Sequence, residues 1–316
     1  MSKILVTGAS GNIGSSLVKA LLDKGKYFVV GVDNLSTGQK SKLPTSERLR
    51  FIKADVNDYQ DISGVFGAYR FDYVFHFAAM VGVKRTLENP LSVLKDIEGI
   101  RNILTLSKNG GVARVFFSSS SEVYGEPVSI PQHEDTTPLN SRLPYAIVKN
   151  VGEAYCKSYY REHDLSYTVF RFFNTYGPNQ SEDFVIPRFL SAALDNRPLI
   201  IYGDGRQTRT FCFISDNVET MIKCLESGLY INETLNIGSD VEYSMLDLAN
   251  LITQKSESHS KIEHVAPLAE GDMVRRCPDV SRMKQVLGRN LIPLDEGLAL
   301  MLKSYRDAKK ATSNDL

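Results

Sequence analysis

A tyrosine and a lysine at positions i and i+4, Tyr145 and Lys149, follow a serine-rich segment that contains Ser120. On a helix these two positions share a face, so the lysine ammonium would lie near the phenol. A phenol is a poor base at neutral pH because its reference pKa is about 10, and a nearby positive charge lowers that pKa. We therefore predict a general base that takes the proton of an alcohol while a hydride leaves the same carbon.

A glycine-rich turn near the start of the chain predicts the cofactor for this chemistry. Residues 3–7 have the pattern of a short buried strand, and residues 15–24 that of an amphipathic helix. Glycines between such elements allow a tight turn and let the backbone approach a pyrophosphate at the helix N-terminus. The spacing is G-x-x-G-x-x-G, with the glycines at Gly8, Gly11 and Gly14.

The second expected strand, residues 28–32, ends in Asp33. This carboxylate stands near the spacing at which an acid meets an adenosine ribose in dinucleotide-binding proteins. An acid at this place also repels a 2′-phosphate, so the sequence favours NAD over NADP.

Composition excludes several other classes of protein. The 37 basic and 37 acidic residues balance, so neither a nucleic-acid groove nor a membrane-binding surface is indicated. The four cysteines are scattered and the histidines lack metal-ligand spacing, so we expect neither disulfides nor a metal site. We expect neither a signal peptide nor a membrane-spanning helix, since no apolar run approaches the ~20 residues that such a helix needs. We expect a cytoplasmic enzyme.

Strand patterns alternate with helix-length segments over the first half of the chain, which predicts βαβ units and a doubly wound parallel sheet. We expect an NAD-binding Rossmann domain over 1–173, with its sheet completed by about 211–240. Residues 174–316 should form a smaller α/β lobe that binds the substrate at the carboxyl edge of the strands. Further strands are expected near 50–55, 73–77, 114–118 and 167–171, and helices near 59–66, 90–109 and 145–163.

These motifs resemble the extended short-chain dehydrogenase/reductase family of NAD-dependent nucleotide-sugar epimerases and dehydratases. The resemblance runs from about Lys3 to Tyr305 and implies an enzyme of the Rossmann class. The segments that carry it, in the family's order, are 7–14, 33–38, 54–56, 76–79, 118–125, Tyr145 with Lys149, 171–178, and 203–205 with Arg209.

The resemblance implies a set of cofactor contacts. The glycines would hold the NAD diphosphate, Asp33 the adenosine ribose, and Lys149 the hydroxyls of the nicotinamide ribose. The expected cofactor-binding residues are Gly8, Gly11, Asn12, Ile13, Gly14, Asp33, Asn34, Asp55, Val56, Ala78, Ala79, Tyr145, Lys149 and Phe172.

The resemblance also implies contacts with a nucleotide-diphosphate sugar. Ser120 would hydrogen-bond the sugar hydroxyl at carbon 4 while Tyr145 removes its proton. An anionic diphosphate favours forked cationic donors, which makes Arg209 a candidate and Arg275 a weaker one. Arg276 is interpreted equally well as a surface charge. The expected substrate contacts are Ser120, Ser121, Asn174, Arg209 and Arg275, and the expected catalytic residues are Ser120, Glu122, Tyr145 and Lys149.

Glu122 leaves the reaction type open. In this family, simple epimerases often have a small neutral residue at this place, whereas dehydratases use a glutamate to take the carbon 5 proton. Residues 277–279 are reminiscent of sugar-acid decarboxylases, while residues 142–149 and 179–188 look more like epimerases. We favour oxidation at carbon 4 within a 4-epimerase. A C4-dehydrogenase, a 4,6-dehydratase and a sugar-acid decarboxylase that uses Glu122 are the alternatives.

Two departures from the family pattern concern the substrate. Asp96 stands where the family usually has asparagine, and Thr210 follows Arg209 in place of the commoner aspartate. A non-catalytic NAD-binding regulator is a different class, and it is disfavoured because the chain keeps the serine, tyrosine and lysine. We expect a homodimer or higher homo-oligomer through the helices near 90–109 and 145–163.

Overall fold

The computed structural model describes residues 1–267 and 275–314. Its centre is a seven-stranded sheet in the order β11–β6–β5–β4–β1–β2–β3, in which every neighbouring pair is parallel. This order confirms the doubly wound parallel sheet. The strands are β1 (Ser2–Thr7), β2 (Tyr27–Asp33), β3 (Leu49–Lys53), β4 (Tyr73–His76), β5 (Arg114–Ser120), β6 (Ser166–Phe172) and β11 (Glu233–Ile237).

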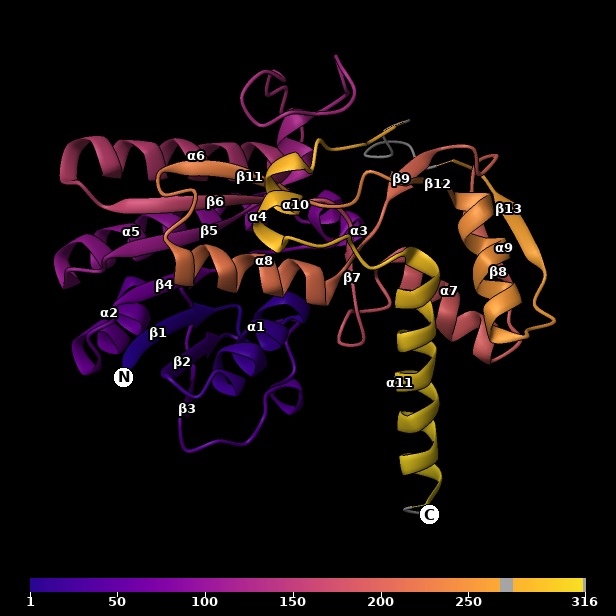
Figure 1. Cartoon of the computed structure of the whole chain (residues 1–316), viewed down its shortest axis with the longest axis horizontal. Coiled ribbons are helices and arrows are strands. Elements are labelled where there is room, and N and C mark those ends of the chain that lie inside the picture. Colours follow the sequence, from indigo (N-terminus) through magenta and orange to yellow (C-terminus); the bar gives the residue numbers. More distant parts are fainter. Residues whose placement is uncertain (268–274, 315–316) are drawn as a thin grey trace.

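Helices cover both faces of the sheet, so its central strands are apolar on both sides. Along β1, Ile4 and Val6 join one buried cluster while Leu5 joins the other. Figure 1 shows α5 and α6 next to each other on one face of the sheet and α8 on the other. The first cluster packs against α1 (Asn12–Asp23) and α8 (Ile214–Ser227), and the second against α2 (Tyr59–Ala68), α5 (Asp96–Gly110) and α6 (Pro144–His163).

The single long helix expected over 90–109 is divided in the structure. A short α3 (Val83–Glu88) precedes α4 (Pro90–Leu94), and α5 begins at Asp96 after an interruption at Lys95. The Asp96 carboxylate accepts a hydrogen bond from the backbone N–H of Met80 at 2.7 Å. This contact ties the start of α5 to the loop after β4 and directs an acidic side chain inward.

The remaining elements form three two-stranded sheets and four helices among the described residues. Figure 1 shows α7, α9, β8 and β13 as a group set apart from the large sheet. In contrast, β11 joins the large sheet beside β6. The elements are β7 (Thr175–Tyr176), α7 (Val185–Leu194), β8 (Leu199–Tyr202), β9 (Thr208–Thr210), β10 (Cys212–Phe213), β12 (Glu242–Ser244), α9 (Met245–Ser256), β13 (Ile262–Val265), α10 (Ser281–Leu287) and α11 (Leu294–Asn314).

In residues 1–267 and 275–314 we find no helix with the length and apolar character needed to cross a bilayer. Over the same residues, no group of three or more histidine, cysteine or acidic side chains could hold a metal ion.

Candidate active site

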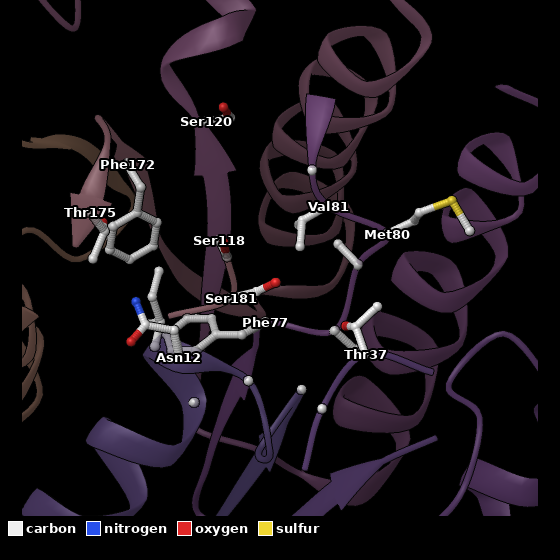
Figure 2. A pocket seen from close by; sticks show the side chains of 18 of the residues that line it. Asn12, Thr37, Phe77, Met80, Val81, Ser118, Ser120, Phe172, Thr175 and Ser181 are labelled. Carbon is white, nitrogen blue, oxygen red and sulfur yellow. The ribbon is translucent and has the colours of Figure 1, made fainter. Parts of the chain in front are cut away.

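A cleft of about 480 Å³ opens at the carboxyl end of the large sheet. The order of the strands reverses between β1 and β4, and doubly wound sheets bind ligands at such a point. Figure 2 looks into this cleft, with Phe172 and Thr175 on one side and Met80 and Val81 on the other. The expected site residues that line it are Gly8, Gly11, Asn12, Ile13, Gly14, Asp33, Asn34, Asp55, Val56, Ala78, Ala79, Ser120, Ser121, Glu122, Tyr145, Phe172 and Asn174.

The glycine turn between β1 and α1 has no room for side chains. Gly8 has a φ of +67°, and a Cβ there would lie 2.8 Å from the backbone nitrogen of Ala78. A Cβ on Gly14 would lie 2.1 Å from the carbonyl oxygen of Gly8. Because the N-cap of α1 is Gly11, no cap side chain occupies the amides of the first turn, and these amides can bind an anion.

Gly14→Ala should weaken NAD binding by about tenfold or more, because the new methyl group collides with the backbone of the turn. Overpacking of this kind typically costs about 1–3 kcal/mol. Calorimetric titration with NAD gives the affinity. Gly64→Ala is the control, since an added Cβ at this exposed position in α2 meets no described heavy atom within 4 Å. It should keep wild-type affinity and raise the free energy of unfolding by about 0.5–1 kcal/mol. Wild-type affinity in Gly14→Ala would exclude the turn as the binding site.

The end of β2 holds a carboxylate in a fixed orientation. Asp33 is buried, and its two carboxylate oxygens accept hydrogen bonds from the backbone N–H groups of Ser10 at 2.9 Å and Leu35 at 2.8 Å. Close by, the amide of Asn34 donates to the carboxylate of Asp55 at 3.3 Å. A glycine cradle for phosphates, followed by an acid fixed at the next strand end, fits a dinucleotide with an unsubstituted adenosine ribose.

The expected catalytic residues Ser120, Tyr145 and Lys149 lie together at the other end of the cleft. Ser120 ends β5; its hydroxyl accepts a hydrogen bond from the backbone N–H of Glu122 at 3.2 Å and lies close enough to the Tyr145 phenol to lower the pKa of that group. Lys149 is buried, and its Nζ donates to the carbonyl oxygen of Ser118 at 2.8 Å. This nitrogen lies 5.7 Å from the centre of the Tyr145 ring. The structure therefore brings the predicted serine, tyrosine and lysine together.

The pKa of Tyr145 differs from the sequence-based expectation. Burial raises the pKa of this phenol, and the neighbouring Glu122 carboxylate raises it further. The neighbouring Ser120 hydroxyl and the charge of Arg276 lower the pKa of Tyr145 but do not outweigh burial. Burial also lowers the pKa of Lys149 to about 8, against the opposing effect of Asp96. In this environment the phenol is a proton donor at neutral pH.

Arg276, which the sequence left as a surface charge, lies in the cleft. Its side chain is only 7% exposed, and its Nη1 lies 3.7 Å from Oε1 of Glu122 and 3.5 Å from Oγ of Ser121. Arg275, the predicted substrate contact, points elsewhere: its side chain is 52% exposed and donates to both carboxylate oxygens of Glu242. Of these two arginines, the second is therefore the one that lines the cleft.

The position of Arg276 is set by contacts that are remote in sequence. The backbone of Arg275 forms an isolated β-bridge with that of Thr208. The segment after Arg276 pairs in the same way with Gln132, whose backbone N–H donates to the carbonyl of Cys277 at 2.8 Å. Successive side chains of an extended segment point in opposite directions. Two adjacent arginines were thus a signal that one of them could face the cleft, but the sequence did not indicate which one.

Asn174 and Arg209, the other expected substrate contacts, are placed differently from each other. Asn174 lines the cleft with a left-handed φ of +35°, and its side-chain amide donates to the carbonyl of Thr210 at 2.9 Å. Arg209 lies on β9, where its Nη1 donates to the carbonyl of Thr208 at 2.7 Å. It is not among the residues that line the cleft.

Asp96 is a cleft residue that sequence reasoning noticed only as a departure from a family pattern. Besides Met80, its carboxylate accepts a hydrogen bond from the amide of Asn57 at 3.3 Å. Burial raises the pKa of Asp96, while the charge of Lys149 lowers it. A carboxylate therefore faces the buried lysine from the start of α5.

Comparisons with known proteins agree with this geometry. The model of the NAD dependent epimerase/dehydratase family matches residues 4–238. UDP-glucuronic acid decarboxylase 4 of Arabidopsis thaliana is 34% identical over 96% of this chain and 68% of its own. UDP-N-acetyl-alpha-D-glucosaminuronate decarboxylase of Bacillus cytotoxicus is 36% identical over 90% of this chain and 91% of its own. The crystal structure of UDP-glucose 4-epimerase from Thermotoga maritima, with UDP-glucose, is similar with a TM-score of 0.91. It is 31% identical and covers 97% of this chain and 99% of that one.

Proposed function

Because this chain belongs to the NAD dependent epimerase/dehydratase family, we propose that it is the NAD-dependent decarboxylase of a nucleotide-activated uronic acid. The reaction begins with oxidation at carbon 4 of the sugar. The carboxylate at carbon 6 is then β to a ketone, and carbon dioxide leaves. Return of the hydride to carbon 4 would restore the alcohol and NAD⁺. This assignment takes one of the alternatives that the sequence left open beside the 4-epimerase.

The observation that carries the proposal is Arg276 beside Glu122. A buried guanidinium is the side chain best suited to bind a carboxylate in a partly desolvated site. It lies at the same end of the cleft as Ser120 and Tyr145, so a sugar presented to them at carbon 4 would have its carbon 6 within reach of this cation. Two of the relatives described above are named as decarboxylases of such sugar acids.

The residues of the chain divide the work of the reaction. Bound NAD⁺ would supply the two-electron oxidant at carbon 4. Tyr145 takes the proton of the 4-hydroxyl, Ser120 hydrogen-bonds the same oxygen, and Lys149 stabilises the phenolate with its charge. When the bond between carbons 5 and 6 breaks, its electron pair forms an enolate that needs a proton at carbon 5. Tyr145, Ser120 and Lys149 act at carbon 4, so Glu122 is the acid–base group that delivers the proton to carbon 5.

The second candidate is the 4-epimerase that the sequence favoured, and the likeness to the Thermotoga maritima epimerase supports it. One experiment separates the two. The NAD-loaded protein is incubated in deuterated water with UDP-glucuronate, UDP-N-acetylglucosaminuronate and their neutral counterparts, and products are followed by NMR. Loss of carbon dioxide with deuterium at carbon 5 supports the decarboxylase. Inversion at carbon 4 with the carboxylate retained and no exchange would reject it.

The buried lysine sets an alkaline limit on the reaction. Its pKa lies near 8, below the usual value, so Lys149 is charged below that pH and loses its charge as the pH rises through it. Oxidation at carbon 4 should therefore decline above about pH 8. Asp96 favours the charged lysine, so Asp96→Asn, which keeps an acceptor for Met80, should shift the decline to lower pH. Stopped-flow absorbance of reduced nicotinamide across pH checks this, and an unmoved profile in Asp96→Asn would contradict it.

The same proposal includes the assembly, location and domain division of the chain. Exposed apolar side chains on α4 and α6, among them Leu91, Ile147 and Tyr160, support a homodimer through this helical layer. All four cysteines are free and buried, which suits the reducing cytoplasm. Residues 1–173 form the nucleotide-binding domain together with β11, and the rest of 174–316 forms the substrate lobe.

A further inference from the structure

Buried polar side chains connect the two halves of the proposed catalytic end. The five side chains that make this connection do not line the cleft. Five side chains, each at most 6% exposed, form what we call the buried polar cluster: Tyr124, Glu134, Glu153, Arg171 and Asn236. Burying so many polar groups is costly unless each is hydrogen-bonded, and a polar network fixes directions that an apolar core would leave free.

One side of the cluster supports the strand and helix that hold Ser120 and Tyr145. Glu153 lies on α6, and its carboxylate accepts from the hydroxyl of Ser119 on β5 at 2.6 Å. Arg171 donates to both oxygens of Glu153, at 2.9 and 2.7 Å, and to the hydroxyl of Tyr124 at 2.8 Å. Ser119 and Glu153 thus tie β5, which ends in Ser120, to α6, which carries Tyr145.

The other side of the cluster leads to Arg276 through Asn236. The Asn236 side chain accepts from the hydroxyl of Tyr124 at 2.7 Å, and Tyr124 belongs to the same 3₁₀ turn, Ser121–Tyr124, as Glu122. The amide nitrogen of Asn236 donates to the carbonyl of Gln132 at 2.8 Å and to that of Asp279 at 3.2 Å. These two residues are paired with each other and hold the segment that carries Arg276.

We propose that Asn236 is a positioning residue that sets Arg276 opposite Glu122. One side chain fixes both partners: its oxygen holds the turn of Glu122 through Tyr124, and its nitrogen holds the segment of Arg276. The inference rests on the proposed function, in which this pair acts after the ketone has formed. Ser120 and Tyr145 are held by the other side of the cluster, so oxidation at carbon 4 depends little on Asn236.

The test separates the two stages of the reaction. Asn236→Leu keeps the branched shape and the number of heavy atoms of the side chain and removes its hydrogen bonds, and Tyr124→Phe removes only the hydroxyl. With UDP-glucuronate and the NAD-loaded protein, both variants should form reduced nicotinamide within about threefold of the wild-type rate. They should release carbon dioxide roughly tenfold more slowly, so that reduced nicotinamide accumulates. Tyr27→Phe, which loses a hydroxyl bonded to Glu226 far from the cleft, is the control and should change neither rate.

A parallel drop in both rates would reduce Asn236 to a structural residue and overturn the inference.

A double-mutant cycle of binding affinities tests, without turnover, whether Asn236 acts through Arg276. UDP-glucuronate affinity is measured by calorimetry for the NAD-loaded Tyr145→Phe protein, which turns over too slowly to interfere, and for the same protein with Asn236→Leu, Arg276→Met or both added. If Asn236 acts through Arg276, the asparagine change has no effect once Arg276 is gone; additive effects refute it. A wild-type protein that binds UDP-glucuronate and releases no carbon dioxide rejects the proposed function alone. Absence of UDP-glucuronate binding to the wild type rejects both.

Discussion

Tyr145→Phe should lower the rate of carbon 4 oxidation by about two to four orders of magnitude, the usual contribution of a positioned acid–base group. The reason lies in the surroundings of the phenol. Burial and the Glu122 carboxylate raise its pKa, so the free residue is protonated. It acts as a base only in its phenolate form, which the charge of Lys149 and the charge of bound, oxidised NAD would favour. Phenylalanine keeps the ring and the packing and removes the only oxygen that can take the proton.

Single-turnover absorbance of reduced nicotinamide measures this rate, and calorimetry shows that NAD still binds. Tyr160→Phe is the matched control, since Tyr160 lies on the same helix, is 41% exposed and does not line the cleft. It should leave the rate unchanged. An oxidation rate in Tyr145→Phe within tenfold of wild type would remove the phenol from the mechanism.

Arg276→Met should lower kcat/KM for a nucleotide uronate by about two to three orders of magnitude. Removing one partner of a buried, hydrogen-bonded charge pair costs about 2–5 kcal/mol. Two interactions are lost here, because the substrate carboxylate no longer has a cationic partner and Glu122 no longer has the guanidinium beside it. Methionine preserves much of the volume of the side chain, so the fold should persist.

The adjacent arginine supplies an unusually close control. Arg275→Met removes the same charge one position away, where the side chain is exposed and paired with Glu242, and kcat/KM should stay within about threefold because exposed ion pairs contribute little. The neutral counterpart, a UDP-hexose without the carboxylate, should bind Arg276→Met as tightly as it binds wild type. Equal losses for Arg275→Met and Arg276→Met would exclude a specific carboxylate site.

The sequence predicted the features that depend on local chain geometry. Gly8, Gly14 and Asp33 each follow a strand closely, and the i, i+4 relation of Tyr145 and Lys149 needs only a helix. These residues could be assigned because the parallel sheet itself brings strand ends to one edge. The family comparison then confirmed the fold class and the cofactor.

The features that escaped prediction depend on contacts between distant segments. The side that Arg276 faces is decided by pairing of its segment with Gln132 and Thr208. The side chain of Asp96 points into the cleft because the helix is interrupted at Lys95, and the helical pattern of the sequence does not predict this interruption. The raised pKa of Tyr145 results from burial by the assembled fold, which a reference pKa of the isolated residue does not include. Arg209, assigned from its motif alone, lies on a separate two-stranded sheet.

The placement of β11 at the end of the sheet has a consequence for biosynthesis. Until Glu233–Ile237 has left the ribosome, β6 is an uncovered border strand whose free amides and carbonyls can template pairing with another chain. Most of the nucleotide-binding elements can already fold by then, since domains fold as units during synthesis. The nascent chain thus passes through a stage in which the domain is nearly folded but its exposed sheet edge is prone to aggregation. A chaperone would need to shield this stage.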